Sequence, residues 1–200
     1  TDRNLAEGMM GLHAPDPVNA AQFAARTAQL LEIYPKEFAY AQMNLLDSHD
    51  MPRFLSLVQG DVRRLKLAYL FLMTYPGAPT IYYGDEIGLT GGRDPNNRKS
   101  FPWNKSQWNQ DLHDFVRELI TIRQSMPVLR TGSYEPIYAD GQIISYLRRE
   151  YEEKVVVAIN ASDNPQTVTI NLNGAIEDQA VLQDQVGDES LDRKSTRLNS

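Results

Sequence analysis

Residues 44–54, with the sequence NLLDSHDMPRF, are the stretch that best indicates the fold of this chain. An apolar run of strand length ends here in polar residues, and Met51 and Pro52 then turn the chain away. A strand that stops at His49 and Asp50 places an imidazole beside a carboxylate at the carboxyl edge of a sheet. Barrels of parallel strands carry their chemistry at that edge. The residues alone leave a second interpretation open, in which this is a polar loop after a strand.

The segments on either side of this stretch alternate between helix and strand. Apolar residues at helical spacing predict helices at 18–33, 61–75 and 110–125, and Asp16 and Pro17 suit the N-cap and first position of the first one. Composition predicts strands at 38–46 and 79–83. This order is typical of parallel α/β units with right-handed crossovers. Because two strands leave both sheet edges open, we expect residues 1–130 to be part of a larger sheet.

The pattern changes near residue 131. Four strand-like segments follow, and Asp140 and Gly141 form a strong two-residue hairpin signal between the first two. These segments are residues 134–139, 142–149, 154–160 and 167–172. They predict a small antiparallel β-sandwich over residues 131–190. Residues 191–200 are polar, rich in basic side chains and without a period, on an acidic chain, and we interpret them as a non-native or disordered tail.

Composition narrows the range of partners. The net charge is −6 and the pI is about 5.1, which argues against nucleic acid or an anionic membrane surface as the main partner. The chain has no cysteine, so it can form neither a disulfide nor a thiolate metal site. No apolar run approaches the ~20 residues of a membrane span. The compartment stays open between the cytoplasm and secretion from a bacterium.

Three motifs in order carry a resemblance to a known family. Residues 77–88, with the sequence GAPTIYYGDEIG, together with LLDSHD at 45–50, closely resemble the α-amylase family of glycoside hydrolases. The third motif is GGRDPNNR at residues 91–98, followed by Phe101, Pro102 and Trp103. The nearest branch is that of neopullulanases, cyclomaltodextrinases and maltogenic amylases. The resemblance covers about residues 16–185.

The resemblance implies a fold of α/β plus all-β class. Residues 1–130 would be the C-terminal part of a (β/α)8 TIM barrel, in which His49 and Asp50 follow strand seven and residues 77–88 contain strand eight. Residues 131–190 would be the small antiparallel β-sandwich of the family. A complete barrel needs about 250 residues, so only its last strands and helices would be present.

The resemblance also implies roles for four side chains. The family uses a retaining mechanism with an Asp nucleophile and a Glu acid/base, and Asp50 matches a second Asp that stabilises the transition state. His49 matches a histidine that hydrogen-bonds the same sugar. Asp94 and Arg98 match a pair that holds a donor-side glucose. The alternatives are an Asx-turn before Pro95 for Asp94 and a surface ion pair for Arg98.

No segment matches the strands of the nucleophile or the acid, which the resemblance places upstream of Thr1. We therefore expect a C-terminal fragment that is inactive alone. The parent enzyme would hydrolyse α-1,4-glucosidic bonds in maltooligosaccharides, starch-type glucans or cyclodextrins. The fragment is expected to bind an α-glucan and to hold no metal or cofactor, while any calcium sites of the parent would lie upstream. Oligomerisation stays open.

Two rival functions follow from the same residues. A non-catalytic amylase-like scaffold, similar to the ectodomain of amino-acid transporter heavy chains, would have no physical need for the four side chains together. A carbohydrate-binding module built on residues 133–185 is left open by its tyrosines, which are Tyr134, Tyr138, Tyr146 and Tyr151. The aromatic side chains near the motifs could either contact sugar or pack locally; these are Tyr82, Tyr83, Trp103 and Trp108.

Overall fold

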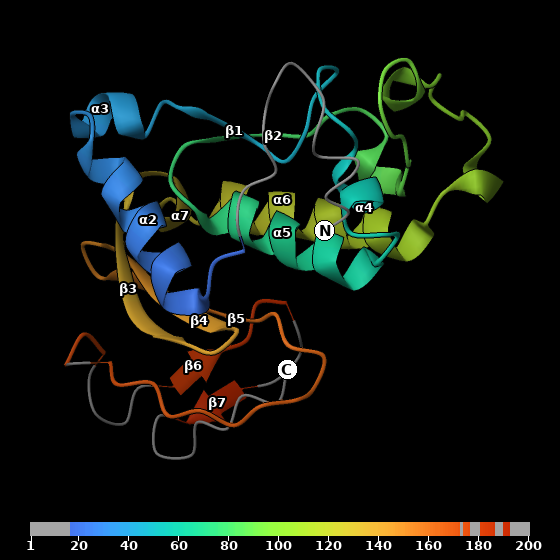
Figure 1. The fold of residues 1–200 in the computed structure, drawn as a ribbon. Coiled ribbons are helices and arrows are strands. Elements are labelled where there is room, and N and C mark those ends of the chain that lie inside the picture. Colours follow the sequence, from blue (N-terminus) through green and yellow to red (C-terminus); the bar gives the residue numbers. More distant parts are fainter. Residues whose placement is uncertain (1–16, 173, 177–180, 187–189, 193–200) are drawn as a thin grey trace. The chain divides into compact units, whose positions relative to one another are not determined.

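A computed structural model of the 200-residue chain describes residues 17–172, 174–176, 181–186 and 190–192 (Figure 1). These residues form two compact units. The first unit contains residues 41–73 and 77–121, and Pro17 belongs to it as well. The second unit contains residues 18–40, 74–76 and the described residues from Ile122 onward. The candidate site residues all lie in the first unit.

A pair of parallel strands organises the first unit. β1 (Met43–Leu45) pairs with β2 (Ala78–Thr80) so that Met43 lies opposite Ala78 and Leu45 opposite Thr80. Between them the chain passes through α4 (Phe54–Leu57) and α5 (Val62–Thr74) (Figure 1). Since the strands run in the same direction, their carboxyl ends meet at one edge of the sheet, which confirms the predicted placement of the two loops.

Both strands are shorter than the sequence predicted. The first residues of the expected strand at 38–46 belong instead to the short helix α3 (Lys36–Ala39), for which Pro35 is the N-cap, so the strand is confined to β1. The expected strand at 79–83 ends at Thr80, and Gly84, with φ +88°, leads into the 3-10 helix η1 (Asp85–Ile87). Gly77 is needed before β2, because a Cβ there would lie 2.3 Å from Asn44 Nδ2.

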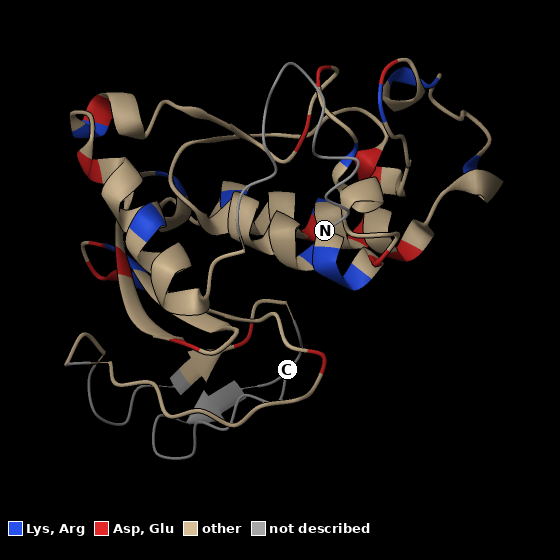
Figure 2. Ribbon diagram, viewed as in Figure 1, with Lys and Arg blue, Asp and Glu red and all other residues tan. Residues whose placement is uncertain are grey.

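Two amphipathic helices supply the apolar core of the first unit, and both match the predicted helical spacing. α5 buries Leu65, Tyr69, Leu72 and Met73, and α6 (Gln110–Ser125) buries Leu112, Val116 and Leu119. Lys66 on α5 forms an ion pair with Asp111 on α6 at 2.6 Å. In Figure 2 the ribbon at the start of α5 is blue, the colour of the basic residues that the helix sequence places there. Among the described residues, no helix combines the length and the apolar character that crossing a membrane requires.

An antiparallel sheet organises the second unit. β3 (Ser133–Asp140), β4 (Ile143–Glu150) and β5 (Glu153–Asn160) are hydrogen-bonded in that order. Asp140 pairs with Ile143 across the two-residue connection, and Gly141 has φ +55°, so the predicted hairpin is confirmed. The short helix α7 (Val128–Thr131) precedes the sheet.

α2 (Ala20–Glu32) packs on β3 in this unit. Its N-cap is Asn19, which forms a capping box with Gln22, so the N-cap predicted at Asp16 was wrong. The reason is local, because the reciprocal hydrogen bonds between these two residues satisfy two backbone donors at the helix start.

The strand predicted at 167–172 is also wrong. This stretch is irregular, and a strand needs a partner to complete its hydrogen-bond ladder. A second antiparallel pair is formed instead by β6 (Val181–Gln183) and β7 (Ser190–Asp192). Leu191 and Asp192, which begin the predicted tail, belong to β7, and residues 193–200 lie outside the described part.

A buried guanidinium joins three segments of the second unit. Arg148 on β4 is fully buried and donates hydrogen bonds only to carbonyl groups among the contacts described. Its acceptors are the carbonyls of Ser133, Thr74, Leu129 and Gly132. Burial lowers the pKa of Arg148. These bonds explain why residues 74–76 at the end of α5 belong with the sheet.

Candidate functional site

The loop after β1 is shaped by its own polar residues. The backbone N–H of Phe54 donates to Asp47 Oδ2 at 2.5 Å. The N–H of Asp50 donates to the Ser48 hydroxyl at 3.2 Å, and that of Met51 donates to the Ser48 carbonyl at 3.2 Å. These bonds close a turn in which His49 and Asp50 lie at the surface of the first unit.

The four side chains predicted for the site lie together. His49 Nε2 is 3.3 Å from Asp50 Oδ1, and Arg98 Nη2 is 3.9 Å from the same oxygen. Arg98 Nε is 3.0 Å from Asp94 Oδ1 and also donates to the His49 carbonyl at 3.1 Å. The side chains are between 47% and 63% exposed. Two loops that are far apart in sequence therefore present two carboxylates, a guanidinium and an imidazole to solvent in one place.

This set can bind a polyhydroxylated ligand. The carboxylates of Asp50 and Asp94 accept hydrogen bonds from hydroxyl groups, and Arg98 donates in a planar fork. His49 can donate or accept, depending on its tautomer. Arg98 lies between the two carboxylates and balances part of their charge. The arrangement suits paired sugar hydroxyls, and Asp50 also offers a negative charge to a cationic species.

Two residues that the sequence did not single out hold the loops in place. Arg53 is fully buried and donates to the Asn97 carbonyl, the Tyr83 carbonyl and Asp85 at 3.0, 2.8 and 2.7 Å. Asn97 is also fully buried, and its side-chain amide donates to the carbonyls of His49 and Met51 at 2.7 and 3.0 Å. Both lie in stretches that the sequence marked, Arg53 in 44–54 and Asn97 in 91–98, but nothing in the sequence indicated that they would be buried or what they would hold.

The tyrosines after β2 pack against Arg53. The rings of Tyr82 and Tyr83 have centroids 4.4 and 4.8 Å from its guanidinium carbon, and they meet each other edge to face. The hydroxyl of Tyr83 donates to the Lys99 carbonyl at 2.7 Å. Of the two interpretations left open by the sequence, these contacts favour packing at the rim of the sheet.

A buried carboxyl pair lies beneath the loops. Burial, followed by the neighbouring Asp47, raises the pKa of Asp85 to about 9, although the Arg53 guanidinium opposes the shift. Asp85 is only 3% exposed and Asp47 is equally buried. Burial therefore favours the neutral form of Asp85 in the folded chain.

The two tryptophans behave differently. Trp108 Nε1 donates to the Pro102 carbonyl at 2.7 Å, and its ring lies 5.7 Å from that of Phe101. Trp108 therefore staples the loop, as one of the two sequence interpretations predicted. Trp103 is 84% exposed and meets only the edge of Phe101 among the ring contacts described.

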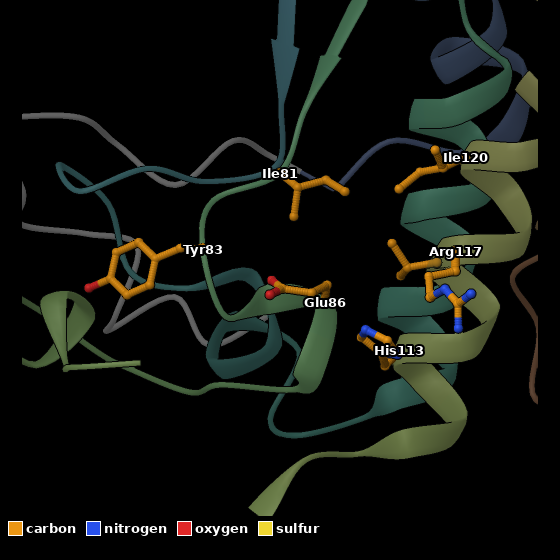
Figure 3. Close-up of a pocket in the computed structure, with 7 residues that line it drawn as sticks. Ile81, Tyr83, Glu86, His113, Arg117 and Ile120 are labelled. Carbon is orange, nitrogen blue, oxygen red and sulfur yellow. The ribbon is translucent and has the colours of Figure 1, made fainter. Parts of the chain in front are cut away.

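A hollow of about 360 Å³ lies elsewhere in the first unit (Figure 3). It is lined by residues that follow β2 and by one face of α6, which are Ile81, Tyr83, Glu86, His113, Val116, Arg117 and Ile120. None of the four predicted site residues lines it. In the part of the chain that the structure describes, no three His, Asp or Glu side chains gather in a way that could hold a metal ion.

Comparison with known families gives two adjacent matches. Residues 15–132 match the family described as alpha amylase, catalytic domain. Residues 132–198 match the alpha-amylase C-terminal domain. Together the matches cover nearly the whole chain, and the first one alone covers more than half of it.

Named relatives point the same way. The chain is 38% identical over 171 residues to a cyclomaltodextrinase of Geobacillus thermopakistaniensis and 36% identical over 168 residues to neopullulanase 2 of Thermoactinomyces vulgaris. These alignments cover 84% and 83% of this chain. They cover 29% of each relative, so the chain spans less than a third of their length.

Solved structures are similar in fold as well. A Thermus thermophilus crystal structure superposes with a TM-score of 0.88 at 37% identity, covering 99% of this chain and 41% of that one. The native debranching enzyme of Nostoc punctiforme gives a TM-score of 0.81 at 38% identity, covering 90% of this chain and 37% of that one. The predicted fold class, a partial barrel followed by an antiparallel domain, is confirmed by these neighbours and by the family matches.

Proposed function

This chain belongs to the α-amylase family, and on that premise we propose that it contributes part of the active site of a glycoside hydrolase that acts on α-glucans. The observation that supports the proposal is the convergence of His49, Asp50, Asp94 and Arg98 from two separate loops. An amylase-like scaffold without carbohydrate chemistry would gain nothing from exposing these four side chains together.

Asp50 is proposed to stabilise the transition state. Breaking a glycosidic bond builds positive charge on an oxocarbenium-like sugar ring, and a fixed carboxylate nearby lowers the energy of that charge. Asp50 is held by a backbone turn and lies beside the His49 imidazole, so its direction is set before a sugar arrives. The same carboxylate can accept hydrogen bonds from the ring hydroxyls.

His49, Asp94 and Arg98 are proposed to bind sugar. A neutral imidazole can donate to a hydroxyl without adding a charge beside Asp50. The Asp94 and Arg98 pair, joined at 3.0 Å, offers an acceptor and a planar donor to adjacent hydroxyls of a second glucose. The proposed ligand is therefore a chain of at least two α-linked glucose units, as in maltooligosaccharides, starch-type glucans or cyclodextrins.

The retaining mechanism of the proposal needs two further carboxyl groups, a nucleophile and an acid. No segment of these 200 residues resembles the strands that supply them in the family. We propose that this chain binds α-glucan but does not turn it over by itself. The proposal assigns no metal or cofactor to these residues.

Calorimetric titration with maltotriose tests the binding part of the proposal. We expect a dissociation constant in the millimolar range, equivalent to about −4 kcal/mol. Arg98→Ala should weaken binding about tenfold. Arg117→Ala is the matched control, because Arg117 is an exposed arginine on α6. Absence of binding at tens of millimolar, or an equal loss in the control variant, would overturn the proposal and favour the scaffold.

A further inference from the structure

We propose that Asn97 is a positioning residue that locks the loop carrying His49 and Asp50 to the loop carrying Asp94 and Arg98. The inference rests on the proposed function, since it explains how the proposed sugar-binding side chains are held in position relative to one another. Asn97 itself points away from solvent and is not expected to touch the sugar.

The amide of Asn97 holds the backbone on both sides of Asp50. Its Nδ2 donates to the carbonyl of His49 at 2.7 Å and to the carbonyl of Met51 at 3.0 Å. These are the residues immediately before and after Asp50. Because a primary amide has two N–H groups at a fixed angle, the two bonds fix both the position and the tilt of the segment between their acceptors.

Other bonds tie the same two loops together. Arg53 donates from Nε to the Asn97 carbonyl at 3.0 Å, and its backbone N–H donates to the Gly91 carbonyl at 2.9 Å. Arg98 Nε donates to the His49 carbonyl at 3.1 Å, so this carbonyl accepts from both Asn97 and Arg98. The loops are therefore joined by side chains from each to the backbone of the other.

Gly91 shows how closely the second loop is folded around Asn97. A Cβ at Gly91 would lie 2.3 Å from the Asn96 carbonyl oxygen and 2.7 Å from Asn97 Cα. The N–H of Gly91 donates to the Ser56 hydroxyl at 2.9 Å, which fixes the start of this loop to α4. The close fold holds Asn97 inward while Arg98, the next residue, faces solvent.

The connection between the loops matters because the proposed sugar-binding side chains must hold fixed positions relative to one another. Groups that recognise a ligand must be held to within roughly 0.5 Å, and a displacement of about 1 Å can cost a hundredfold in rate. His49 and Asp50 come from one loop, and Asp94 and Arg98 come from the other. The relative position of the two loops, and not only the presence of the four side chains, then sets the affinity.

The test compares Asn97→Asp with Asn96→Asp. Aspartate has the shape of asparagine but no N–H donor, so Asn97→Asp removes both bonds that flank Asp50. Asn96 is its exposed neighbour, and the same substitution there adds the same charge to the same loop. We expect maltotriose affinity per folded molecule to fall at least tenfold in Asn97→Asp and to stay within twofold in Asn96→Asp.

Hydrogen exchange provides a readout that does not depend on sugar. Asn97→Asp should accelerate amide exchange in residues 48–53 as well as in 93–98, whereas Asn96→Asp should accelerate neither. If Asn97→Asp does not fold, as judged by tryptophan fluorescence, Asn97→Ser replaces it with the same expectations, because serine retains only one short donor.

The outcomes separate this inference from the proposed function. Failure of the unaltered chain to bind maltotriose contradicts the proposed function, and exchange alone then decides whether Asn97 joins the loops. Faster exchange confined to residues 93–98, or unchanged affinity in a folded Asn97→Asp variant, overturns the positioning role. A lower unfolding midpoint with normal affinity would show that Asn97 only stabilises the loop.

Discussion

Asp85 is a buried acidic residue that is linked through Arg53 to the loop carrying Asp94 and Arg98. Its carboxyl group is buried beside Asp47 and lies 2.7 Å from the Arg53 guanidinium, which in turn holds Asn97. Burial and the second carboxylate raise the pKa of Asp85 to about 9. The folded chain therefore carries a proton on Asp85 at pH values where the unfolded chain has lost it.

This difference predicts a pH dependence of stability. Between pH 5 and 8 the folded state binds one more proton at Asp85 than the unfolded state does. The free energy of unfolding should therefore fall as pH rises, by up to about 1.4 kcal/mol per pH unit. Asp85→Asn should remove this slope. Urea unfolding, followed by the fluorescence of Trp103 and Trp108, measures the slope in the first unit.

The matched neutralisation for this comparison is Glu118→Gln, at an exposed position on α6. Glu118→Gln should show the same change of unfolding free energy with pH as the unaltered chain. Parallel stability profiles for the unaltered chain and Asp85→Asn across this range would show that Asp85 does not hold the extra proton.

Gly91 gives a second prediction at the scale of one residue. Gly91→Ala adds a methyl group that would lie 2.3 Å from the Asn96 carbonyl oxygen, so the loop must open. We expect the first unit to lose about 1–3 kcal/mol, which is typical of overpacking. The measurement is the same urea transition, and a midpoint that does not change would mean that the loop adjusts without cost.

The site could be predicted from the sequence only where the chemistry lies in a motif. His49, Asp50, Asp94 and Arg98 belong to stretches that resemble a family, and the structure brings them together. Their roles in binding and catalysis stay predictions. Arg53 and Asn97 lie in the same stretches, but no role could be predicted for them, because their importance comes from burial, which depends on how two distant loops close on each other.

At the scale of the elements, periodic patterns were the most reliable guide. The apolar spacing of α5 and α6 and the Asp140 and Gly141 turn were sufficient to predict two helices and a hairpin. The strand expected at 167–172 is a different case, because it does not form. Its alternation is typical of a strand, yet pairing depends on a neighbouring strand that local sequence does not specify.

The β4–β5 turn offers an element-scale prediction. Tyr151 has φ +50°, a left-handed conformation that tyrosine rarely adopts, and its side chain is 92% exposed. Tyr151→Asn should raise the free energy of unfolding of the second unit by about 0.5–1 kcal/mol, because asparagine tolerates this conformation better. Thermal unfolding measured by circular dichroism checks the change.

Glu152→Asn is the control for this turn, since residue 152 is not among those with positive φ in the described chain. Equal stabilisation by both substitutions would mean that turn polarity, rather than the backbone conformation at Tyr151, is responsible.

At the scale of the whole molecule, the proposal is that this chain supplies only part of an active site. The chain spans 29% of the curated relatives named above, and Asp50 is the one residue here for which a direct role in bond cleavage is proposed. We therefore expect that incubation of this chain with maltoheptaose releases less than one new reducing end per molecule, measured by a reducing-sugar assay. Repeated turnover would mean that a nucleophile and an acid lie within these residues.

The central claim is that two loops of the first unit form one α-glucan-binding surface. Its most direct test is an NMR titration of the labelled chain with maltotriose, in which every backbone amide reports separately. We predict that saturable shifts gather in residues 48–51 and 93–98. Shifts confined to the antiparallel sheet at residues 133–160, as a carbohydrate-binding module would give, or no saturable shifts at all, would contradict the claim.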